Sequence, residues 1–218
     1  MEHIGGLSGN LLKWIKDFLI ERQMRTVIKN CVSSWTTVTS RVPQGSVLAP
    51  IIFLIYVNDM VDGISSYASL FADDVKIMRR IKVEEDCSLL QEDLRKIYEW
   101  SQMWEMEFNA KKCKILEMGR SDKRTTGNYN IGPELIPKTK EKKDLGILIQ
   151  DDLSPEKHIN KIVSTTYQLL TSIKMAFNYM DEDMMKRTIV AIICPRLKYA
   201  AVAWSPHKIK DIRMIHKD

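Results

Sequence analysis

The sequence has few of the features that mark disulfide-stabilised, secreted or membrane-spanning proteins. Its four cysteines, at positions 31, 87, 113 and 194, form no C-x-x-C pair and have no histidine nearby, which disfavours a zinc site. No apolar run reaches the ~18 residues of a spanning helix, and the start, MEHIGGLSGN, lacks the basic and apolar regions of a secretory signal. Reduced thiols, an intracellular location and no membrane partner are therefore predicted.

The overall composition is that of a folded protein. Hydrophobic residues make up 44% of the 218 positions and charged residues 28%, close to globular averages. A chain of this length can bury a core without metals or disulfides. Lysine plus arginine is 33 against 28 acids, a formal charge of +5. This mild excess suits a phosphate-bearing partner but does not require one.

Hydrophobic periodicity predicts the elements of the first half of the chain. Apolar residues at helical spacing predict helices over 8–22, 46–59 and 84–104. The middle one is apolar almost all round and is expected to be buried. Runs rich in Val, Ile, Thr and Trp predict a hairpin around Asn30, and YASLFADDVKIM predicts strand, turn and strand over 67–78.

The second half contains a polar segment between two short strands. The polar, basic stretch 119–143 is the best boundary candidate, and its charge run KTKEKKD is interpreted as a solvated loop. Strands are predicted over 112–118 and 144–150. A long helix is expected after Ser154, its cap, and a last helix from about Asp183 is disturbed by Pro195.

Two adjacent carboxylates, Asp73 and Asp74, interrupt the apolar strand pattern. At the tip of a hairpin they would repel each other unless a cation lay beside them. Mg²⁺ prefers carboxylate oxygens and keeps positions open for phosphate, and paired ions can clamp the attacking and leaving oxygens of a phosphoryl transfer. On the residues alone, a solvated Asp-Asp turn remains the alternative.

The segment PQGS, directly before the apolar helix, is a second candidate. Gly45 permits close approach of the backbone to a ligand, while Gln44 and Ser46 offer donors and acceptors. The helix N-terminus that follows carries free N–H groups suited to phosphate. By itself this is a weak signal, because such turns commonly precede helices.

Taken together, these segments resemble the palm of reverse transcriptases from non-LTR retrotransposons, especially jockey-like LINE elements. The resemblance runs through VPQGSVLAPIIFLIYVNDM, SLFADDVKI, LQEDLRKIYEWSQMWEMEFNAKKCKILEMG, KDLGILIQ and PRLKYAAVAWSP, in this order. It implies an α+β fold, with a polymerase palm whose antiparallel sheet is backed by helices. The implied division is a remnant of fingers and palm over 1–42, the palm over 43–150 and an incomplete helical thumb over 151–218.

The same resemblance implies an activity and its partners. The activity is RNA-directed DNA polymerisation, a templated nucleotidyl transfer to a primer 3′-hydroxyl. The implied partners are an RNA template, a DNA primer and deoxynucleoside triphosphates, and the implied cofactor is Mg²⁺ (or Mn²⁺).

The resemblance also implies roles for residues of the FADD segment and for one lysine. FADD matches the family's catalytic hairpin, so Asp73 and Asp74 are the implied catalytic acids and metal ligands. Phe71 takes the place of the motif's aromatic residue, beside nucleotide and template. Lys112 matches the lysine after the palm helix, which is implied to neutralise or protonate the leaving pyrophosphate.

Two further segments carry binding roles by the same resemblance. PQGS matches the loop that contacts template and incoming nucleotide, which points to Gln44, Gly45 and Ser46. Leu145 and Gly146 match the turn that grips the primer end. These roles come from the match and not from the composition of either segment.

One departure from the family pattern matters for the chemistry. A third carboxylate, in a pattern like apolar-D-x-x-x-A-F-D, is expected upstream, and none occurs before Pro43; Asp17 lies in a helical run. Arg41 and Ala49 stand where the family usually has glycine. We therefore expect the isolated chain to be impaired, with an exposed sheet edge. The alternative is a catalytically dead relic that at most binds nucleic acid, through its net charge and the basic segment 138–143.

Overall fold

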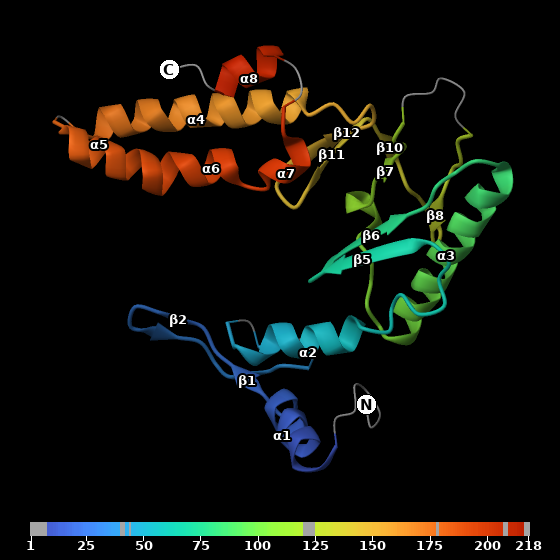
Figure 1. Cartoon of the computed structure of the whole chain (residues 1–218). Coiled ribbons are helices and arrows are strands. Elements are labelled where there is room, and N and C mark those ends of the chain that lie inside the picture. Colours follow the sequence, from blue (N-terminus) through green and yellow to red (C-terminus); the bar gives the residue numbers. More distant parts are fainter. Residues whose placement is uncertain are drawn as a thin grey trace. The chain divides into compact units, whose positions relative to one another are not determined.

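The structure is a computed structural model of the 218-residue chain, and it describes residues 8–39, 42–43, 45–119, 125–177, 179–206 and 209–215. The chain separates into two compact units, Met1–Phe108 and Asn109–Asp218, coloured blue to green and green to red in Figure 1. Their boundary falls inside the span 43–150 that the resemblance assigns to the palm. Helices and small two-stranded sheets are mixed along the chain, so the α+β class is confirmed at that level.

The first unit begins with a helix and a narrow two-stranded ribbon. The ribbon turns at Lys29 and Asn30, as the sequence predicts, and all eight of its strand residues are exposed. Its two paired segments are antiparallel. The elements are α1 (Gly9–Leu19), β1 (Gln23–Met24), β2 (Val27–Ile28), β3 (Cys31–Val32) and β4 (Thr36–Thr37).

The core of the first unit lies where two helices meet a hairpin. Val57, Met60 and Ile97 are at most 3% exposed, and part-buried side chains from the hairpin pack against them. Burying such side chains contributes roughly 1.5–3 kcal/mol each. The elements are α2 (Leu48–Val57), β5 (Tyr67–Phe71), β6 (Asp74–Met78) and α3 (Glu84–Met103).

The apolar helix α2 is less buried than its composition predicts. Phe53 and Tyr56 pack into the core with Val57, but Ile51 and Leu54 are about half exposed. The expectation of an all-round buried helix is therefore wrong for this unit. The reason is that the Val57 cluster packs on one side of α2, so the other side of the helix keeps its apolar residues in solvent.

The second unit combines short strands with a helical segment. In Figure 1, α4 runs beside the chain of α5 and α6, and the two are in contact. Strand pairs are β7 with β10 (parallel), β8 with β9, and β11 with β12 (both antiparallel). The elements are η1 (Ala110–Lys112), β7 (Ile115–Leu116), β8 (Asn130–Ile131), β9 (Glu134–Leu135), β10 (Lys138–Thr139), β11 (Glu141–Asp144), β12 (Ile147–Gln150), α4 (Glu156–Ala176), α5 (Glu182–Thr188), η2 (Ile189–Ile193), α6 (Cys194–Lys198), α7 (Ala201–Trp204) and α8 (Ile209–Ile215).

The charge run KTKEKKD is not the loop that its composition indicates. It forms β10 and β11, and β11 pairs with β12 along its full length. Backbone hydrogen bonds hold the ladder whatever the side chains are, so Glu141, Lys142 and Lys143 remain exposed while their backbone is paired. Charge alone therefore misassigned this segment.

Pro195 disturbs the last helical run in a specific way. The five residues Ile189–Ile193, just before it, form a π-helix between α5 and α6. Proline has no N–H for the carbonyl four residues earlier, and its ring crowds that carbonyl. Widening the preceding turn relieves both problems. The predicted long helix after Ser154 is confirmed as α4. Its N-cap is Pro155 and not the predicted Ser154, although the Glu156 N–H donates to Ser154 Oγ at 3.4 Å.

Candidate functional site

The Asp73–Asp74 pair lies at the tip of the β5–β6 hairpin. Phe71 pairs with Asp74 across the ladder, which leaves a two-residue loop, Ala72–Asp73. Ala72 has φ +51° and Asp73 has no positive φ, the pattern of a type II′ turn whose twist matches the strands. Alanine in this left-handed region carries backbone strain. The tip is thus a tight, strained turn that presents two consecutive carboxylates.

The hairpin has one packed face and one open face. Leu70, Val75 and Ile77 point to the core cluster of the first unit. Phe71, paired with Asp74, is 61% exposed, and both aspartates are exposed. The packed face fixes the strands against the core, and the open tip leaves both carboxylates accessible to a large substrate.

The donor set at the tip suits a hard divalent cation only in part. Carboxylate oxygens are the ligands that Mg²⁺ and Mn²⁺ prefer. Among the described residues, however, no group of three or more His, Cys, Asp or Glu side chains could hold a metal ion. Asp73 and Asp74 therefore fit two positions of such an ion, with the others left for phosphate oxygens or water.

The PQGS turn builds the start of α2. Ser46 Oγ donates to the Pro43 carbonyl at 3.0 Å and accepts the Ala49 N–H at 3.1 Å. Its hydroxyl thus caps the helix, a use that resemblance alone does not reveal. Gly45 is exposed with φ +84°, and an added Cβ would meet nothing within 4 Å. Glycine is therefore required at this position by the positive φ and not by lack of space. Gln44 lies outside the described residues.

The other predicted site residues belong to the second unit. Lys112 ends η1 with its side chain exposed, and its carbonyl accepts the Lys142 ammonium at 3.2 Å. Leu145 and Gly146 form the two-residue loop between β11 and β12. Their φ values, +44° and +92°, are both positive, which is the pattern of a type I′ turn.

Tyr199 holds the Leu145–Gly146 turn in place. Its hydroxyl donates to the Leu145 carbonyl at 2.8 Å, and a Cβ on Gly146 would lie 3.2 Å from Tyr199 Cε1. The tyrosine lies in the segment PRLKYAAVAWSP, which the family resemblance singled out without a role for this residue. Only tertiary structure links it to a turn 54 residues earlier.

Gly146→Ala is expected to lower the free energy of unfolding by about 1–2 kcal/mol, from the strain of an L-residue at positive φ, with a further cost from the Tyr199 contact. Urea titration of the full chain measures this. Gly63→Ala is the matched control, because Gly63 has φ +74° and an added Cβ meets nothing within 4 Å. A loss no greater than that of the control would contradict the Tyr199 contact.

A buried histidine connects β12 to α4 in the second unit. His158 is 4% exposed, and its Nδ1 accepts the Leu148 N–H at 3.1 Å. Its ring packs edge-on against Trp204, with the two ring centroids 5.5 Å apart. Burial, with a smaller effect of Lys161, lowers the pKa of His158. The imidazole is therefore neutral in the folded unit at pH 7, and its protonation would replace the acceptor by a donor facing an N–H.

His158 should make stability depend on pH in the mildly acidic range. Because its folded pKa lies below the unfolded value of about 6.5, stability is fully present above pH 6.5 and is lost as the pH falls toward the folded pKa. His158→Asn keeps an acceptor for Leu148 but does not titrate. We expect the variant to lose less unfolding free energy than the wild type between pH 7 and pH 5. Equal losses in urea titrations would refute this role.

The chain matches one protein family and several individual relatives. The family profile described as reverse transcriptase (RNA-dependent DNA polymerase) matches residues 6–149. The RNA-directed DNA polymerase from mobile element jockey of Drosophila funebris is 29% identical over 206 residues, which cover 89% of this chain and 22% of that protein. The probable RNA-directed DNA polymerase from transposon X-element of Drosophila melanogaster is 29% identical over 207 residues, 87% of this chain and 22% of that protein.

A third relative is also named as an RNA-directed DNA polymerase. The jockey polymerase of Drosophila melanogaster is 29% identical over 157 residues, 68% of this chain and 17% of that protein. The chain thus spans about a fifth of the length of these relatives. No solved structure matches the chain.

Proposed function

This chain belongs to the reverse transcriptase (RNA-dependent DNA polymerase) family, and on that premise we propose that it is the palm-bearing segment of a jockey-like retrotransposon polymerase. The observation that carries the proposal is the Asp73–Asp74 turn, which projects two exposed carboxylates from a hairpin packed on its core. In this proposal the palm spans 43–150, and 151–218 begins the thumb. An intracellular location stays a prediction from the sequence.

The proposed reaction adds a deoxynucleotide to the 3′-hydroxyl of a DNA primer on an RNA template. A divalent cation, Mg²⁺ or Mn²⁺, supplies charge neutralisation in such a transfer. Asp73 and Asp74 hold carboxylate oxygens at a tip open to a bound nucleotide. Phe71, exposed on the same face as Asp74, offers a ring beside that nucleotide.

The remaining roles in the proposal are positional. Lys112 meets the negative charge of the leaving pyrophosphate, and the turn at Leu145 and Gly146 holds the primer end. Gln44, Gly45 and Ser46 contribute through the loop before α2, whose start the Ser46 hydroxyl caps. Phosphoryl transfer depends mainly on such positioning and on charge stabilisation.

Activity of the isolated chain should be low. Two adjacent acids hold a pair of cations poorly without a bridging third carboxylate, and the described residues contain no cluster of three potential ligands. Removing one element of charge stabilisation typically costs 10²–10³-fold in rate. We therefore expect the chain alone to extend a primer at least ~100-fold more slowly than a complete polymerase.

A chimera provides the direct test. In this chimera the chain replaces the matching segment of the jockey polymerase from Drosophila funebris, over the 206 aligned residues. The measurement is extension of a DNA primer on poly-rA in Mg²⁺ and in Mn²⁺. Extension by the chimera supports the proposal. A chimera that folds and binds primer–template but does not extend in either metal would overturn it.

A second function, nucleic-acid binding without catalysis, is favoured by the ribbon of the first unit. Residues 22–39 contain three cations, Arg22, Arg25 and Lys29, and no acid. The Arg25 guanidinium lies 4.6 Å from the ring centre of Trp35, and Trp35 is 57% exposed. Cations beside exposed aromatic rings suit the backbone and bases of a single strand. The basic run supports this less, because Lys138 pairs with Glu117 at 2.8 Å.

The binding function predicts a salt dependence that the ribbon controls. For single-stranded RNA, the logarithm of the binding constant should fall linearly with the logarithm of the salt concentration. Arg25→Gln should reduce the steepness of this line by about 1. Fluorescence anisotropy across a salt series measures both. Lys174→Gln, an exposed lysine at the end of α4, is the control. No binding at low salt, or an equal effect of the control, would exclude a role for the ribbon.

A further inference from the structure

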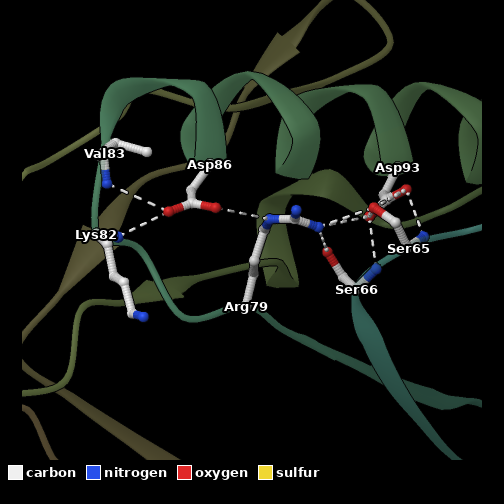
Figure 2. A network of polar contacts seen from close by, with 7 residues as sticks. All are labelled: Ser65, Ser66, Arg79, Lys82, Val83, Asp86 and Asp93. Atoms are coloured by element: carbon white, nitrogen blue, oxygen red, sulfur yellow. Dashed lines mark hydrogen bonds and ion pairs between the residues drawn. The ribbon is translucent and has the colours of Figure 1, made fainter.

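One buried carboxylate holds the root of the strand that leads to Asp73. Asp93, on α3, is 1% exposed. Its two oxygens accept the backbone N–H groups of Ser65, at 2.9 Å, and of Ser66, at 2.8 Å, and the Ser65 hydroxyl donates to it at 3.1 Å. Figure 2 shows both serines converging on this side chain. Since Tyr67 begins β5, the start of the hairpin is tied directly to α3.

The other strand of the hairpin is tied to the same carboxylate through Arg79, the residue after β6. Its Nη1 donates to Ser65 Oγ at 2.8 Å and lies 3.8 Å from Asp93 Oδ2. Its Nε lies 3.8 Å from Asp86 Oδ1, so the guanidinium extends between two carboxylates of α3 (Figure 2). Asp86 also accepts the N–H groups of Lys82 and Val83 at 2.8 and 3.2 Å, which fixes the start of that helix.

The root matters because the tip is distant from it. Tyr67 and Met78 form the pair of the ladder farthest from the turn, and Phe71 and Asp74 form the pair next to it. At ~3.4 Å per residue, the turn projects about 17 Å from Ser66 and Arg79. The strands pack on the core through one face, while the turn itself is exposed. Because the ladder joins the two strands along their length, a shift at the root is carried to the turn that bears the two carboxylates.

We propose that Asp93, acting with Arg79, is a positioning residue that sets where the hairpin places Asp73 and Asp74. It touches no substrate and acts through the two strand ends that it holds. The catalytic meaning of this inference rests on the proposed function, whereas the mechanical coupling stands on the contacts of the first unit alone. Displacement of reacting groups by about 1 Å can cost 10²-fold in rate, so a fixed root serves the chemistry.

Amide hydrogen exchange of the full chain tests the coupling. Asp93→Asn keeps the size of the side chain but turns an amide NH₂ toward one of the two serine N–H groups. We expect the amides of β5 and β6 to exchange about tenfold faster or more, with those of α3 within about threefold of wild type. Glu92→Gln is the matched control, because Glu92 neighbours Asp93 on α3 and pairs with exposed Arg95.

A second pair of variants keeps the proposal testable if Asp93→Asn does not fold. Arg79→Gln should accelerate exchange of the β5–β6 amides about tenfold, and Arg79→Lys should accelerate it less, because its ammonium keeps the charge but replaces only one of the two guanidinium contacts. Equal acceleration in the hairpin and in α3 would show a general structural role and overturn the proposal. So would a hairpin whose exchange does not change in any of these variants.

A metal arm separates this inference from the proposed function. Mn²⁺ added to the wild-type chain should broaden the amide signals of Ala72 to Val75 if the two carboxylates bind the ion. Absence of that broadening counts against the proposed function and leaves the exchange result on Asp93 intact. If Mn²⁺ broadens these signals but the Asp93 and Arg79 variants do not exchange the hairpin amides faster, the proposed function stands and the positioning role of Asp93 is overturned.

Discussion

Asp73→Asn is expected to reduce primer extension by the jockey chimera at least ~100-fold in Mg²⁺. The substitution keeps the shape of the side chain but replaces a ligand oxygen by an NH₂ group and removes one negative charge at the turn. Asp73 is exposed and lies in the two-residue loop, so the change should cost little stability. Single-turnover extension on poly-rA with a saturating deoxynucleotide measures the effect.

The control for this prediction is an exposed aspartate away from the turn. Asp62, which follows α2 in the same unit, is exposed, and Asp62→Asn should leave extension within about threefold of the parent. Primer–template binding should change little in Asp73→Asn, because one acid contributes weakly to a large nucleic-acid interface. A variant that extends at more than a third of the parental rate would refute the catalytic role of Asp73.

Asp93→Ala is expected to lower the unfolding free energy of the chain by about 3–5 kcal/mol. Truncation leaves the Ser65 and Ser66 N–H groups without their acceptor and removes the carboxylate that faces Arg79. Unsatisfied buried donors each cost about 1–3 kcal/mol. Urea titration followed by circular dichroism gives the value. Glu92→Ala, which loses only an exposed ion pair with Arg95, should cost far less, and equal losses would contradict the role of the buried contacts.

The effect of Asp93 should also depend on pH. Burial raises the pKa of this carboxyl, but the hydrogen bonds from Ser66 and Ser65 outweigh it and hold the pKa below its usual range. Ionised Asp93 therefore stabilises the folded state above about pH 4, and this contribution is lost as the pH falls through the lowered folded pKa. The difference between wild type and Asp93→Ala should be constant from pH 7 to 5 and shrink below pH 4. A difference that persists unchanged at pH 3 would contradict this.

Local pattern predicted the β5–β6 hairpin well. Strand, turn and strand over 67–78 match β5 and β6 because alternating apolar residues need a packed face, and Ala72–Asp73 completes a two-residue turn. The pattern of side chains failed to predict the structure where polar side chains belong to a backbone that pairs in a sheet. The run KTKEKKD forms strands because its backbone pairs with β12 and β7, which its charges do not reveal. Apolar α2 keeps Ile51 and Leu54 half exposed because its core lies on one side.

The sequence by itself determined the family, the Asp73–Asp74 turn and the order of the main helices, because each of these is encoded in contiguous residues. Tertiary structure alone decided what holds the root of the hairpin. Ser65 and Asp93 are 28 positions apart, and Ser65 and Arg79 are 14 apart, so no local pattern brings them together. In the sequence, nothing distinguishes Asp93 from the other polar residues of the helix. Packing of α3 against the hairpin buries it, and a buried carboxylate must find donors, which it does at the ends of the two strands whose turn bears Asp73 and Asp74.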